Sequence, residues 1–182
     1  SGGLFKSKAA RDWPFAERTM ASYREKKLAQ KGLDAAEAKA LGGKAEFEKA
    51  ESEFSLLAKN YPSHPAGKFF LAMIDWWKIL MTIDDESRDA AFIQKMDEVI
   101  ELCDSLLDVN ENDVSALFFK GGALGFQGRL RANRSSWIKA ANDGRLALPI
   151  VQKAHKIAPD NYDILLGIGI YNYYAATIPE KY

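Results

Sequence analysis

The sequence predicts an all-α protein built from stacked helix pairs. From residue 34 onward, apolar side chains recur at helical spacing between short polar breaks, and no segment alternates between polar and apolar residues as a strand would. There is also an internal repeat, because Gly121 follows Ala72 by 49 residues and Gly169 follows Gly121 by 48, each in a similar aromatic and aliphatic stretch. A fixed period of this length is typical of a helical solenoid.

The chain divides into a basic N-terminal arm and a repeat domain. The arm covers residues 1–33, and we expect it to contain a helix that begins near Pro14, since proline is accepted in the first helical turn. The repeat domain covers residues 34–182. We expect three units in it, at about 34–80, 88–130 and 132–176.

Polar and proline-containing breaks separate the expected helices. They fall at 62–65, 84–87, 110–113, 128–136, 142–144 and 159–161. The helix before each repeated break has small or apolar residues at i, i+4 and i+7, which is one helical face. These residues are Ala50, Phe54 and Leu57, then Val99, Cys103 and Leu106, then Ala147, Val151 and Ala154. Each unit is therefore a helix pair.

Formal charge is balanced over the whole chain but not along it. The 25 basic and 25 acidic residues cancel, so we expect no nucleic-acid partner. Residues 1–45 hold ten basic and five acidic side chains, whereas residues 84–113 hold eleven acidic ones. Cys103 is the only cysteine, which excludes an internal disulfide and a multi-cysteine metal site, and we expect it in the core. No apolar run is long enough to span a membrane.

Two stretches carry a resemblance to the tetratricopeptide (TPR) repeat family. Residues 115–129 resemble the first helix of that repeat, with Gly121 in the slot where two helices pack closely and Gly128 at the turn. Residues 147–159 resemble its second helix and closing proline. The resemblance covers about residues 45–176 and implies a right-handed α-solenoid of antiparallel helix pairs.

The sequence departs from the family pattern in three ways. Roughly 14 residues are inserted between the helices of each pair, at about 80–94 and 129–143, so we expect the tight turn to be lost and the helices to be longer. Lys120 replaces the usual leucine and Glu111 the closing proline. The last helix, from Tyr162 onward, has no partner, so we expect a missing segment or a second copy of the chain to cover it.

The resemblance also implies a binding surface, because first helices line the concave face of the solenoid. Its exposed slots include an aromatic and apolar set at Phe69, Met73, Trp76, Trp77, Phe118, Phe126, Tyr173 and Tyr174. The remaining slots fall on Ala66, Ser115, Gly122, Asp163, Leu166 and Ile170. Aromatic rings are frequent at binding hot spots. The alternative is that lengthened helices pack more tightly and these rings form core.

An arginine cluster is the second candidate site. Arg129, Arg131 and Arg134 lie around the second insertion and could clamp an anion, since guanidinium groups bind carboxylates and phosphates in bidentate geometry. The alternative is structural pairing with the acidic segment at 84–113. The two histidines, His64 and His155, lie in different units with no second ligand nearby, so we expect no metal site and no cofactor.

These features favour a non-enzymatic scaffold that binds a peptide or partner protein on an aromatic concave face. One alternative is an envelope-associated assembly factor, or a carrier that holds a small apolar ligand in a pocket between helices. Another is that the basic arm docks on an anionic membrane or nucleic acid. The start at Ser1-Gly2-Gly3 suggests that the native N-terminus is missing, and the resemblance favours an exported or envelope-associated bacterial protein.

Overall fold

The computed structural model describes the backbone of residues 47–177 and the side chains of residues 47–173. Within this range the chain forms six α-helices and no strand, which confirms the predicted all-α class. The helices are α4 (Phe47–Asn60), α5 (Ala66–Met81), α6 (Asp89–Val109), α7 (Val114–Asn133), α8 (Trp137–Ile157) and α9 (Tyr162–Thr177). The predicted arm at 1–33 and the first part of the first unit lie outside the described residues.

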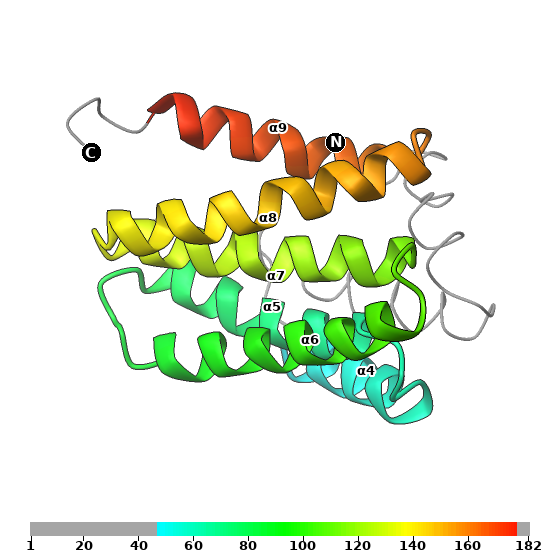
Figure 1. The fold of residues 1–182 in the computed structure, drawn as a ribbon. Coiled ribbons are helices and arrows are strands. Elements are labelled where there is room, and N and C mark those ends of the chain that lie inside the picture. Colours follow the sequence, from blue (N-terminus) through cyan, green and yellow to red (C-terminus); the bar gives the residue numbers. More distant parts are fainter. Residues whose placement is uncertain (1–46, 178–182) are drawn as a thin grey trace, which may run out of the picture.

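The helices lie side by side in a stack (Figure 1). Each helix contacts the next one, and α7 also contacts both α5 and α9. The helices α4 and α9 lie at opposite ends of the stack (Figure 1). As a result, α9 is packed by α8 and α7, and no described helix covers its other side.

Short polar segments end the helices where local chemistry predicts it. Asp113 caps α7, because its side-chain oxygen accepts a hydrogen bond of 2.9 Å from the backbone N–H of Ala116. His64 acts similarly at the start of α5, where Nδ1 accepts from the N–H of Ala66 at 3.2 Å. The Nε2 of this histidine also lies 3.3 Å from Ser115 Oγ, which ties the connection before α5 to α7.

The predicted break at 142–144 is wrong, and the one at 128–136 is correct only at its end, because the connection covers residues 134–136. Gly128 lies inside α7 and is buried against α8, where an added Cβ would come within 3.2 Å of Asp143 Cβ. Residues 142–144 lie inside α8, because the Asp143 carboxylate is buried in an ion pair with Arg131 and a turn there would separate the two. The tight turn is not lost but displaced to residues 134–136, where Ser135 has a φ of 57°.

The second insertion therefore lengthens the two helices that flank this turn. The helices α7 and α8 contain 20 and 21 residues, in accordance with the expectation of longer helices. The first insertion is divided between a 21-residue α6 and the connection at 82–88.

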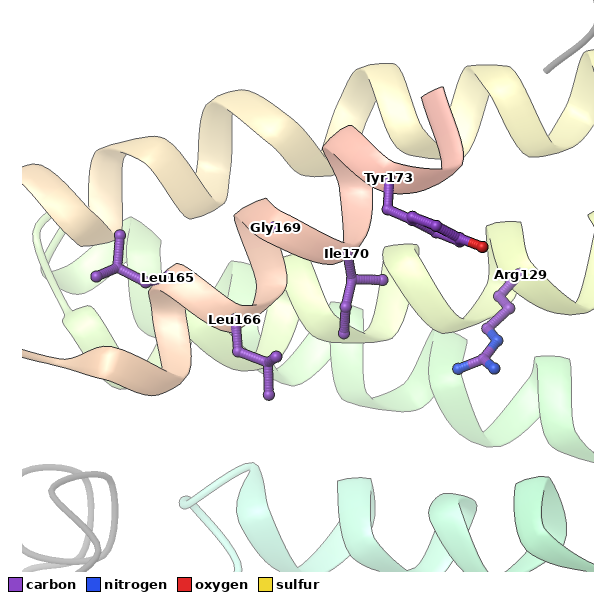
Figure 2. Close-up of a pocket in the computed structure, with 6 residues that line it drawn as sticks. All are labelled: Arg129, Leu165, Leu166, Gly169, Ile170 and Tyr173. Carbon is purple, nitrogen blue, oxygen red and sulfur yellow. The ribbon is translucent and has the colours of Figure 1, made fainter. Parts of the chain in front are cut away.

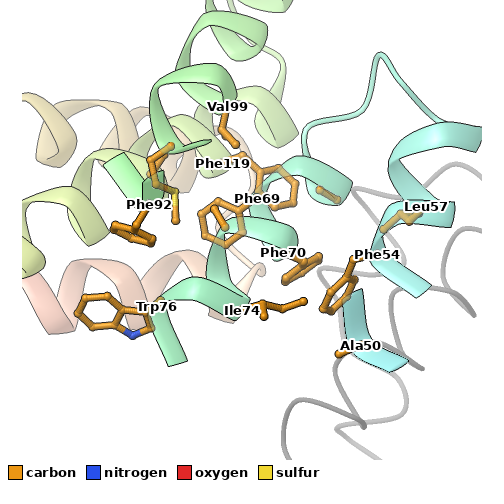
Figure 3. Packing of buried hydrophobic residues seen from close by; sticks show 14 of the residues in the cluster. Ala50, Phe54, Leu57, Phe69, Phe70, Ile74, Trp76, Phe92, Val99 and Phe119 are labelled. Carbon is orange, nitrogen blue, oxygen red and sulfur yellow. The ribbon is translucent and has the colours of Figure 1, made fainter. Parts of the chain in front are cut away.

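The main core lies between α4 and α7 and is rich in aromatic rings (Figure 3). Phe69 is central to it, since its ring is 5.7 Å from that of Phe70, 5.2 Å from that of Phe119 and 6.0 Å from that of Phe126. These are edge-on contacts, the arrangement that aromatic quadrupoles favour. Cys103 is fully buried here, as predicted.

A smaller core joins α7, α8 and α9. Its fully packed members are Leu117, Ala154 and Ile164. The helices α7 and α8 approach closely at Gly121, where an added Cβ would overlap Cγ2 of Val151. Gly121 thus has the close-packing role that the sequence predicts for it.

Candidate functional site

The structure buries some residues of the aromatic face that the resemblance implies and leaves others exposed. Phe69 and Trp76 are only 7% and 1% exposed, so they belong to the core and not to a surface that a partner can reach. Trp76 is buried because α6 and α7 cover it, with ring centroids 5.7 Å away at Phe92 and 5.4 Å away at Phe126. These two residues therefore pack in the core, which was the alternative to a role in binding, and they do not belong to a binding face.

The remaining predicted positions differ in exposure. Three are half-buried against the core: Met73, Phe118 and Phe126. Trp77 is 37% exposed on α5, and Tyr173 is 66% exposed on α9. The side chain of Tyr174 lies outside the described residues. The most exposed predicted ring is therefore on the last helix.

Arg134 has a structural task. Its Nε donates to Asp89 Oδ2 at 2.6 Å and its Nη2 donates to Asp89 Oδ1 at 3.0 Å, which is a bidentate pair. The same guanidinium also donates to the backbone carbonyls of Ile83 and, at 3.3 Å, Asp85. Arg134 thus pairs with Asp89 of the acidic segment and holds the 82–88 connection in place. This structural pairing is the alternative to an anion clamp.

The other two arginines contact different residues from Arg134. Arg131 donates to the buried carboxylate of Asp143 across the α7–α8 interface. Burial raises the pKa of Asp143, and the Arg131 guanidinium opposes that shift. Arg129 lies over the ring of Trp76, 5.1 Å from its centroid. The three arginines therefore do not converge on one anion site.

Arg129 instead lines a hollow of about 600 Å³ between α7 and α9 (Figure 2). The other lining residues all belong to α9: Leu165, Leu166, Gly169, Ile170 and Tyr173. Leu166 and Ile170 point in the same direction from α9, and Arg129 of α7 lies on the side of Ile170 and Tyr173 (Figure 2). The hollow is open to solvent, since Leu166 and Tyr173 are 63% and 66% exposed.

The opposite side of α9 holds the helix in place. Ile164 is fully buried, and Ile168 packs against the same small core. One turn further, the ring of Tyr171 lies where a Cβ on Gly144 of α8 would come within 3.0 Å of it. These contacts leave the side with Leu166 and Ile170 facing outward.

The exposed side of α9 is apolar and nearly without charge. Asp163 is the only charged residue between Tyr162 and Thr177. Five of its large hydrophobic residues are exposed: Tyr162, Leu165, Leu166, Ile170 and Tyr173. Contiguous exposed apolar surface of this kind marks interaction sites more often than single exposed residues do.

Sequence reasoning found part of this surface. It assigned Leu166, Ile170 and Tyr173 to a binding face, and the structure brings them together with Arg129. It named Gly169 as a position of the repeat and did not assign Leu165 to the binding face. The signal that could have found both is the repeat itself, because it places Gly169 and Leu165 at the positions of Gly121 and Leu117, which α8 covers.

A second hollow, of about 470 Å³, lies at the end of α5. Its lining is Met81, Thr82, Ile83, Asp84 and Asp85. Arg134 holds this connection through two of its backbone carbonyls. The lining is short and mixed in polarity, so the hollow on α9 is the stronger candidate for a binding site.

The chemistry of the described residues does not define a reactive centre. Burial raises the pKa of the Cys103 thiol to about 12, so this side chain stays a protonated core residue. Between residues 47 and 173, no three His, Cys, Asp or Glu side chains gather as they would around a metal ion. None of the described helices combines the length and apolar character needed to cross a membrane.

Comparison with protein-family models, curated proteins and solved structures found no match to this chain. The fold and the site by themselves define a class: an all-α protein whose last described helix presents an apolar face beside an arginine.

Proposed function

We propose that the chain is a non-enzymatic interaction scaffold and that its helices form a right-handed α-solenoid of antiparallel pairs, similar to tetratricopeptide repeats. The contacts of α7 with α5 and α9 support the solenoid, because alternate helices touch as well as consecutive ones. The close approach of Gly121 to Val151 supports the family resemblance, since the resemblance puts a small residue at that slot.

The observation that carries the function is the hollow between α7 and α9. An apolar side chain of a partner can enter it between Leu166 and Ile170, with Arg129 and Tyr173 at the edge of the contact. A buried apolar anchor with a polar rim is the usual arrangement of a protein interface. The partner site is therefore smaller than the aromatic face first predicted, and it lies on the last helix.

An open hollow favours a peptide or protein over a small apolar ligand. The carrier hypothesis requires an enclosed cavity, because an apolar molecule is retained when most of its surface is buried. Leu166 and Tyr173 are instead more than half exposed, so they can contact an extended surface. On the resemblance alone, we also propose that the chain is an exported or envelope-associated bacterial protein.

The test is a selection of displayed 20-residue peptides on the full chain, followed by binding measurements with an Ile170→Asp variant. A carboxylate in the hollow must be desolvated when the partner packs on it, so we expect selected peptides to lose at least about tenfold in affinity. Ile138→Asp is the matched control, because Ile138 is 85% exposed on α8 and does not line the hollow.

The expected result is that selected peptides bind wild type and the Ile138→Asp variant equally well. Circular dichroism and thermal melting of both variants establish that each is folded before affinities are compared. Peptides that bind the Ile170→Asp variant as tightly as wild type would show that the hollow is not the binding site. Failure to select any peptide that binds saturably would count against the scaffold itself.

A further inference from the structure

The interface between α7 and α8 provides an internal template for the exposed side of α9. On α7, Gly121 lies so close to Val151 of α8 that a Cβ would overlap Cγ2 of the valine, and the carbonyl of Ala147 would lie 3.7 Å from that Cβ. One turn earlier, Leu117 is 4% exposed and packs with Ala154. We call Val151, with Ala147 and Ala154 on either side of it, the knob on α8. We call Gly121, with Leu117 one turn before it, the socket on α7.

The same socket recurs on α9, 48 residues later. Leu165 corresponds to Leu117 and Gly169 to Gly121. Leu165 is nevertheless 39% exposed, and no atom of the described residues comes within 4 Å of a Cβ built on Gly169. Glycine inside a helix is unfavourable relative to alanine. At Gly121 close packing offsets that cost, whereas nothing in the described structure offsets it at Gly169.

The chemistry of the socket narrows the choice of occupant. Apart from Arg129 of α7, the side chains that line the hollow around Gly169 belong to α9 and carry no charge, so the surface directly over Gly169 favours an apolar partner side chain. A residue opposite a helix glycine allows two backbones to approach closely when it is small or β-branched. The helix α6 also has small or β-branched residues at these positions, one unit earlier. Val99 and Cys103 match Ala147 and Val151, and both are fully buried.

We propose that the Gly169 face of α9 binds a partner helix of the α8 type, which places a β-branched residue on Gly169 and alanines about one turn before and after it. This rests on the proposed function and names the partner class: a helix with small residues at i, i+4 and i+7, packed along α9 as α8 packs along α7. A second copy of the chain, or residues 1–46 of the same chain, are the competing occupants.

The test uses a synthetic peptide with the sequence of residues 137–157, held helical by a lactam bridge on its outward side and labelled for fluorescence anisotropy. The native α8 already occupies α7, so the peptide can add only at α9. We expect saturable binding to the full chain. Replacing Val151 by Lys in the peptide should weaken binding by at least about tenfold, since the knob would then carry a positive charge into an apolar socket that has Arg129 beside it.

Two alanine variants of the protein give the matched comparison. Gly169→Ala and Gly125→Ala both place a methyl group where no described atom lies within 4 Å, and Gly125 does not line the hollow. Both should raise Tm, because alanine favours the helix. Only Gly169→Ala should weaken peptide binding, by about tenfold, because the added methyl group fills the socket. A gain in stability with a loss of binding is an outcome that damage to the fold cannot imitate.

Other results would overturn the inference in recognisable ways. If Gly169→Ala lowers Tm, the face is already covered within the chain. If sedimentation equilibrium shows a dimer that Gly169→Ala converts to a monomer, the occupant is a second copy. If the helical peptide does not bind while selected peptides do bind and depend on Ile170, the scaffold function stands and the α8-type partner is wrong.

Discussion

Between α4 and α7 the core is built from rings, whereas between α7 and α9 it is built from small and branched side chains. In the first region Phe69 and Phe119 lie edge-on to each other and are 7% and 0% exposed. In the second region Gly121 and Ala154 bring helices close together, but among the side chains described on α9, those of residues 162–173, only Ile164 is fully buried. The helix α9 therefore retains exposed apolar surface, and this is the surface that we propose for binding.

The α4–α7 region therefore mainly stabilises the fold, whereas α9 carries the surface that we propose for binding. Rings bury a large area each, so the α4–α7 region supplies most of the hydrophobic stabilisation that the described helices can gain. Small residues bury less area but fix the distance between helices. A protein arranged in this way can keep α9 partly unpacked without losing the fold, because the larger core does not depend on it.

The largest expected effect is the loss of a ring from the first core. Phe119→Ala should lower the free energy of unfolding by about 3–5 kcal/mol, because Phe119 is fully buried and contacts the rings of Phe69 and Phe70. Urea denaturation followed by circular dichroism measures this change. Tyr173→Ala is the control and should change stability by less than about 0.5 kcal/mol, since Tyr173 is mainly exposed. Equal losses in the two variants would contradict the division between the regions.

A smaller loss is expected where the two regions meet. Arg134→Ala should cost about 1–3 kcal/mol, because it removes the bidentate pair with Asp89 and the donor to the carbonyl of Ile83. Lysine at this position should recover only part of the loss, since an ammonium group cannot make the forked contact. Hydrogen exchange should show faster exchange in the 82–88 connection of the alanine variant. Unchanged exchange there would mean that Arg134 does not hold the connection.

Local chemistry explains why many breaks were predictable from the sequence. The break before α7 has Asp113 as an N-cap, and the break before α5 has a proline on either side of His64, so neither depends on distant residues. Residues 142–144 carry the same kind of turn signal, yet they continue α8. Their conformation is decided by distant partners, since Arg131 pairs with Asp143 and the ring of Tyr171 lies close to Gly144.

The two adjacent tryptophans show what periodicity could not decide. The helix α5 is apolar on nearly every side, so the sequence does not indicate which of its faces α6 and α7 cover. In the structure Trp76 is buried by Phe92 and Phe126, whereas Trp77 remains partly exposed. On α9 the resemblance gave Ile170 and Tyr173 as outward positions, and both are exposed. The same resemblance gave Phe69 and Trp76 as outward positions, and both are buried.

The smallest effects form the sharpest comparison, because one substitution at two equivalent glycines should change stability in opposite directions. Gly121→Ala should lower the free energy of unfolding by about 1 kcal/mol, since the methyl group overlaps the stiff side chain of Val151 and this overpacking outweighs the gain in helix propensity. Gly169→Ala should raise it by about 0.5–1 kcal/mol, since the methyl group enters open space and only the propensity changes. Thermal and urea unfolding of the two variants and of the double variant measure both signs. If both variants lose stability, the two halves of the repeat are packed alike and the exposed socket on α9 does not exist in solution.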